Sequence, residues 1–93
     1  IMQVERGLVM VIHEEDLSDG DRSVVGVATT RDKALEMIKE YYGFGEEYKE
    51  EAVMSDFKDI RDNNLDFSCI VAVSGYLGGV YKVWAEDFNI NML

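Results

Sequence analysis

The chain has 93 residues and a formal net charge of −10, from 19 acidic residues against 9 basic ones. The acidic excess runs along the whole chain, so we assign it to the folded surface, where it repels nucleic-acid phosphates and anionic membranes. The charge therefore argues against nucleic acid and membrane as partners and favours a protein with a basic surface. The length predicts one domain over residues 1–93.

The first 28 residues predict a β-hairpin. Residues 7–13 and 22–28 are rich in β-branched and large apolar side chains, and a polar stretch that contains Asp19-Gly20 joins them. Two such runs around an Asp-Gly turn are typical of a hairpin. Ile1 precedes Met2, and we interpret it as a residue left from an expression tag.

A helix is predicted after this hairpin. Thr29 or Thr30 can accept hydrogen bonds from the first helical amides, and Asp32 suits the positive end of the helix dipole. Apolar residues then recur at helical spacing as far as Tyr42, and Gly43 stands where a left-handed C-terminal residue belongs.

Residues 44–64 carry helix-forming residues and a dense acidic load. Val53, Phe57 and Ile60 are spaced so that one face of a helix would hold all three. We therefore expect either one kinked helix or two short ones, ending at Asn63-Asn64.

Two further strands are expected at residues 67–73 and 80–85, with a glycine-rich turn between them at 74–79. Residues 88–93 either extend the last strand or form a tail. The order β-β-α-(α)-β-β predicts an α+β fold: a two-layer domain with an antiparallel sheet of about four strands and helices packed on one face.

Both faces of the expected strands are apolar, whereas a half-solvated sheet usually alternates apolar and polar residues. Val9 and Val11 would line an exposed patch together with Ile70 and Ala72, if their strands are neighbours. Either the chain's own loops and tail cover this patch, or a second subunit covers it and forms a homodimer through the sheet.

No catalytic, metal or cofactor site is predicted. His13 is the only histidine, and a metal site needs three or four converging ligands. Cys69 lies in an apolar strand, which predicts a buried structural thiol. One cysteine cannot form an internal disulfide, so a reducing cytoplasmic setting is expected. The compactness of the chain, together with its lone cysteine, favours a bacterial or phage-type protein. We therefore expect a protein that is not an enzyme.

Aromatic and apolar residues that are hard to bury occur next to acids, which is typical of a binding surface for a basic protein. The candidate interaction surface comprises Phe44, Glu46, Glu47, Tyr48, Glu50, Glu51, Tyr76 and Leu77. The expected function is a small acidic protein-interaction or inhibitor domain that engages a basic partner; an inhibitor that mimics DNA is its sharpest form. The alternative is a small-ligand-binding or weak metal-binding domain, monomeric or dimeric, with a pocket near His13.

Overall fold

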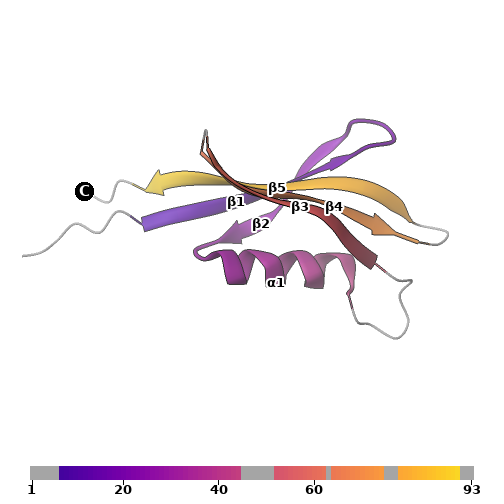
Figure 1. The fold of residues 1–93 in the computed structure, drawn as a ribbon, viewed down its shortest axis with the longest axis horizontal. Coiled ribbons are helices and arrows are strands. Elements are labelled where there is room, and N and C mark those ends of the chain that lie inside the picture. The colour runs from indigo at the N-terminus through magenta and orange to yellow at the C-terminus, as the bar shows by residue number, and fades with distance from the viewer. Residues whose placement is uncertain (1–6, 45–51, 63, 75–77, 91–93) are drawn as a thin grey trace, which may run out of the picture.

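The computed structural model describes residues 7–44, 52–62, 64–74 and 78–90 (Figure 1). In these ranges five antiparallel strands form one sheet, and one helix lies between the second and third strands in the sequence. The elements are β1 (Gly7–Asp16), β2 (Arg22–Ala28), α1 (Arg31–Tyr42), β3 (Ala52–Asp62), β4 (Leu65–Val73) and β5 (Gly79–Ile90).

The last strand of the chain is the central strand of the sheet, because the spatial order is β2-β1-β5-β4-β3. It pairs with β1 from Gly7↔Ile90 to Asp16↔Tyr81 and with β4 along most of its length. The two hairpins, β1–β2 and β3–β4, are thus joined into one sheet by a strand that comes from neither. The outermost strands are β2 and β3.

The helix α1 has the two ends that its sequence predicts. Thr30 has extended backbone, and its hydroxyl oxygen accepts a hydrogen bond of 3.1 Å from the Lys33 amide. At the other end Gly43 has a φ of 74°, and its amide and that of the next residue donate to the carbonyls of Glu40 and Lys39. This pair of bonds is a Schellman motif, which ends a helix at a left-handed residue.

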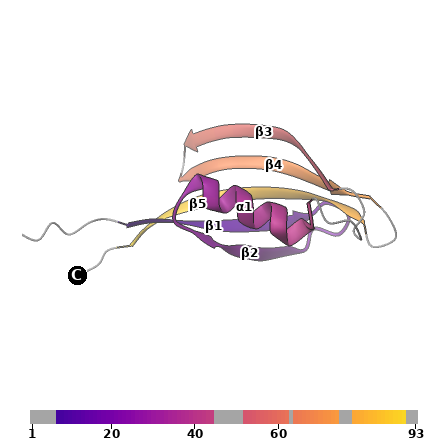
Figure 2. The same cartoon turned by 90° about the horizontal axis from the view of Figure 1, so that it is seen from below.

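The core lies between α1 and one face of the sheet, as Figure 2 shows from the helix side. Alternate residues of β1, β4 and β5 point into it, and Ile12, Phe67 and Val83 are fully buried together with Ile38 from the helix. Burial of each such side chain contributes roughly 1.5–3 kcal/mol. Within the described ranges, α1 is the helix that covers this face of the sheet.

The expected two-layer α+β fold, with about four strands and more than one helix, is wrong. The described part of the chain is mostly sheet: five strands of 7 to 12 residues accompany one helix of 12 residues. The error lies in residues 44–64, where helices were expected. The strand β3 occupies residues 52–62 instead.

Irregularities in β3 hide the alternation that would have indicated a strand. Its pairing with β4 shifts register twice, and Asp56 and Arg61 have φ values of 49° and 46° near these shifts. Each extra residue interrupts the two-residue alternation of a strand. Phe57 therefore stacks on Phe67 on the helix side, with ring centroids 5.4 Å apart, although Val53, four residues earlier, lies on the opposite face with Ala72 and Val80.

The strand β5 extends to Ile90, so the first part of the expected tail belongs to the sheet. The interpretation of Ile1 as a tag residue falls outside the described residues. Within the described ranges, the chain has no helix with the length and apolar character that a membrane crossing requires.

Candidate functional site

Seven of the eight residues in the predicted interaction surface lie outside the described part of the chain: Glu46, Glu47, Tyr48, Glu50, Glu51, Tyr76 and Leu77. Phe44 is described. It follows the C-terminal turn of α1, is partly buried and packs against the core.

The sheet face opposite α1, which we call the open face, has no described element packed on it (Figure 1). Several of its apolar side chains are half exposed: Val27 is 53% exposed, Val80 45% and Phe88 46%. Val9 and Val11 lie on this face too, but Ile70 and Ala72 are not their neighbours, because β5 runs between β1 and β4. The apolar side chains are therefore divided between the two ends of the face.

Trp84 lies at the centre of the open face. It is in the middle of β5, and its ring stacks on His13 of β1 with centroids 5.2 Å apart and planes 15° apart. The Arg22 guanidinium lies 5.9 Å from the Trp84 ring centre. Glu86 places a carboxylate oxygen 3.2 Å from Nε2 of His13, without the alignment of a hydrogen bond. The proximity of these groups could not be predicted from the sequence, because it depends on the pairing of β1 with β5.

Charge is balanced around this tryptophan. Glu15 and Glu86 carry negative charge there, and Arg22 and Lys82 carry positive charge. Nε of Arg22 binds the Glu15 carboxylate at 2.8 Å. The centre of the open face is therefore close to neutral in a chain whose net charge is −10.

A shallow hollow of about 170 Å³ lies beside Trp84. Its lining residues are Glu15, Arg22, Ile60, Leu65, Ser68, Lys82 and Trp84. Small-molecule sites usually enclose roughly 300–1,000 Å³, and His13 is not part of this lining. No group of three or more His, Cys, Asp or Glu residues in the described ranges is arranged to hold a metal ion.

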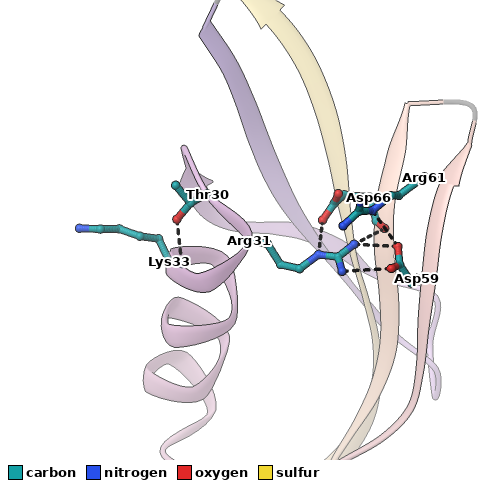
Figure 3. Close-up of polar contacts among 6 residues, drawn as sticks. All are labelled: Thr30, Arg31, Lys33, Asp59, Arg61 and Asp66. Carbon is teal, nitrogen blue, oxygen red and sulfur yellow. Dashed lines mark hydrogen bonds and ion pairs between the residues drawn. The ribbon is translucent and has the colours of Figure 1, made fainter.

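The helix side carries different polar groups. The first helical residue, Arg31, donates to the Asp59 carboxylate at 2.8 Å and to the Asp66 carboxylate at 2.8 Å (Figure 3). Its guanidinium also lies 5.9 Å and 5.8 Å from the ring centres of Phe57 and Phe67. The hydrogen bond from Arg31 is the main cause that lowers the pKa of Asp59. We call Arg31, Asp59 and Asp66 the arginine clamp, because they fasten the start of α1 to β3 and β4.

Glu14 is a buried acid that sequence reasoning missed. It is 9% exposed, and its carboxylate accepts hydrogen bonds from Tyr42 at 2.6 Å and Ser23 at 2.7 Å. Burial and the adjacent carboxylate raise the pKa of Tyr42 strongly. The burial of Glu14 could have been predicted from its place in β1, because strand alternation puts it on the same face as the buried Met10 and Ile12. These contacts give Glu14 a role in packing between β1 and α1.

Cys69 is 1% exposed, which confirms the predicted buried thiol. Burial raises its pKa to about 11. A thiol of this kind is almost wholly protonated at neutral pH and is a poor nucleophile.

The exposed side of α1 carries three carboxylates. Asp32, Glu36 and Glu40 are spaced by four residues and are all exposed, and we call them the acidic stripe. Glu36 and Glu40 lie opposite the buried residues of the helix, and Lys33 and Lys39 border them.

Comparisons of the chain with protein-family models, with curated proteins and with solved structures find no match. Function is therefore argued from the geometry above.

Proposed function

We propose that this chain is a non-enzymatic protein-interaction domain that engages a basic surface of a partner protein through the acidic stripe of α1. The observation that carries this proposal is the arrangement of charge on the exposed side of α1: Asp32, Glu36 and Glu40 form one line, and Lys33 and Lys39 lie on either side of it. The centre of the open face, by contrast, carries two acids and two bases and offers a basic partner no such line.

The spacing of the acidic stripe supports the proposal. Residues four apart on a helix lie about 6 Å apart along its axis, and like charges at that spacing destabilise a helix by about 0.2–0.5 kcal/mol per pair. Lys33 and Lys39 offset part of this repulsion, but a basic partner would remove more of it. Electrostatic contacts of this kind steer association and weaken as salt is added.

The buried Cys69 supports the non-enzymatic part of the proposal, because its thiol is not available as a nucleophile. The same lone thiol is the ground on which we propose a cytoplasmic setting. A small-ligand site near His13 receives less support, since the hollow beside Trp84 is smaller than most ligand pockets and His13 does not line it.

The proposal is tested with two variants of equal net charge. The first neutralises the acidic stripe by Asp32→Asn, Glu36→Gln and Glu40→Gln. The second neutralises three exposed acids away from α1 by Asp21→Asn, Asp56→Asn and Asp62→Asn. A decalysine peptide serves as the basic probe, and isothermal titration calorimetry at low and at physiological salt measures its binding.

We expect the stripe variant to bind the peptide several-fold more weakly than the matched variant, and wild type to bind most tightly. Equal losses in the two variants would contradict the proposal, because the peptide would then respond to net charge and not to the helix.

A further inference from the structure

The open-face residues of β5 form a pattern that is complementary to itself. Counted outward from Trp84, Lys82 stands on one side and Glu86 on the other, and then Val80 and Phe88 follow. The two charges are opposite, and the two end residues are apolar and about half exposed. Because β5 is the central strand of five, this pattern runs through the middle of the open face.

We propose that a second copy of this chain covers the open face, related to the first by a two-fold axis that runs across the strands at Trp84. Such an axis places Trp84 against Trp84 of the second copy and Lys82 against its Glu86, twice in each dimer. Val80 then lies against Phe88 of the second copy. A two-fold interface of this kind uses the same surface on both subunits, so one self-complementary strand is sufficient to build it.

The shape of the sheet allows this arrangement. Figure 1 shows that the β1–β2 turn and the adjoining ends of β3 and β4, at opposite corners of the sheet, both curve away from α1. A sheet twisted in this way has the form of a saddle. A saddle turned over about an axis along or across its strands fits its own copy, and packed sheets with nearly aligned strands are common in proteins.

Charge selects between these two axes. An axis along the strands would place Lys82 on Lys82 and Glu86 on Glu86, which is repulsive in both cases. The axis across the strands joins opposite charges instead. It also brings Leu65 and Ile70 of β4 together between the two copies, because Leu65 pairs with Glu86 and Ile70 pairs with Lys82 in the sheet.

The open face is large enough for a stable contact. Five strands about 4.8 Å apart and the nine residues from Val80 to Phe88, at about 3.3 Å each, span roughly 700 Å². Stable interfaces bury about 800 Å² per partner. Two chains with a net charge of −10 would meet where local charge is balanced, and Glu15 enters the contact already bound to Arg22. A basic partner, by contrast, would meet no acidic excess there.

The test reverses the charge of Lys82 in one variant and the charge of Glu86 in another. Lys82→Glu places a second carboxylate opposite Glu86 in its own dimer, and Glu86→Lys places two ammonium groups opposite each other. Each variant alone should dimerise about thirty-fold more weakly than wild type, because two exposed ion pairs of up to about 1 kcal/mol each are lost. An equimolar mixture should form a heterodimer nearly as tight as wild type, because every charged pair is then complementary.

Sedimentation equilibrium over a concentration series, with one variant fluorescently labelled, measures these affinities. Trp84 is the single tryptophan, so its emission should also shift to shorter wavelength as wild type dimerises. Lys33→Glu and Glu36→Lys, on the exposed side of α1, repeat the changes in net charge away from the interface and should not favour each other in a mixture.

A wild-type chain that stays monomeric up to submillimolar concentration would overturn the proposal. So would a dimer whose Lys82 and Glu86 variants associate with themselves as tightly as with each other. Neither result affects the proposed function, which depends on the opposite side of the molecule and is measured with the decalysine peptide.

Discussion

The two faces of this sheet are formed by the same strands, but their side chains differ in burial and in composition. On the helix side, alternate residues such as Ile12, Phe67 and Val83 are completely buried. On the open side, Phe88 is 46% exposed, and apolar residues stand beside charged ones. The helix side is a core that one chain completes by itself. The open side has the mixed composition of an interface, in which an apolar and aromatic set is accompanied by polar groups.

The largest expected loss of stability comes from a substitution in the core on the helix side. Phe67→Ala should lower the free energy of unfolding by about 3–5 kcal/mol, because the ring is fully buried and its removal leaves a cavity. Phe88→Ala, on the open side, should lower the stability of the monomer by less than about 1 kcal/mol, because the ring already contacts water. Urea unfolding at a protein concentration too low for association measures both. Similar losses in the two variants would show that the faces do not differ as described.

The second expected effect concerns the arginine clamp. Arg31→Met should lower stability by about 1–3 kcal/mol, because it leaves the partly buried Asp66 carboxylate without its donor. Arg31→Lys should recover only part of the loss, since an ammonium cannot bind two carboxylates with the planar geometry of a guanidinium. Thermal unfolding of the three proteins at neutral pH gives the ranking.

The clamp also predicts a pH dependence with a defined sign. Arg31 lowers the pKa of Asp59 in the folded protein below its ordinary value of 3.8. The stability from this contact is therefore present above about pH 4 and is lost as the pH falls through the lowered pKa. The difference in stability between wild type and Arg31→Met should accordingly shrink on acidification below about pH 4. A difference that stays constant from neutral pH to about pH 2.5 would contradict this assignment.

Local signals in the sequence predicted the local parts of the fold. The hairpin β1–β2 follows from two apolar runs around Asp19-Gly20, and both ends of α1 follow from Thr30 and Gly43. These elements depend on residues that are close in the chain. The strand β3 could not be predicted in the same way, because its register shifts interrupt the two-residue alternation of a strand and its pairing is with a later strand.

The site around Trp84 on the open face could not be predicted from the sequence for a related reason. The central place of Trp84 depends on β5 pairing with β1 and β4 together, and these contacts join residues about 70 and 15 positions apart. The apolar character of both strand faces was readable, and it predicted an exposed patch. The sequence could not show that β5 runs through the middle of this patch, or that equal numbers of acidic and basic side chains surround Trp84 there.

The last prediction compares the reactivity of thiols on the two faces, at adjacent positions of one strand. Cys69 points to the helix side, where burial raises its pKa to about 11, and Ser68 points to the open side beside Trp84. In the native protein, Cys69 should react with a thiol reagent such as DTNB only as fast as the protein opens. Cysteine introduced by Ser68→Cys together with Cys69→Ala should react rapidly at low protein concentration. Its rate should then fall as concentration rises, because a second copy on the open face would shield it. Rapid reaction of Cys69 in the folded chain, or slow reaction at position 68 in the dilute monomer, would contradict the distinction between a closed and an open face.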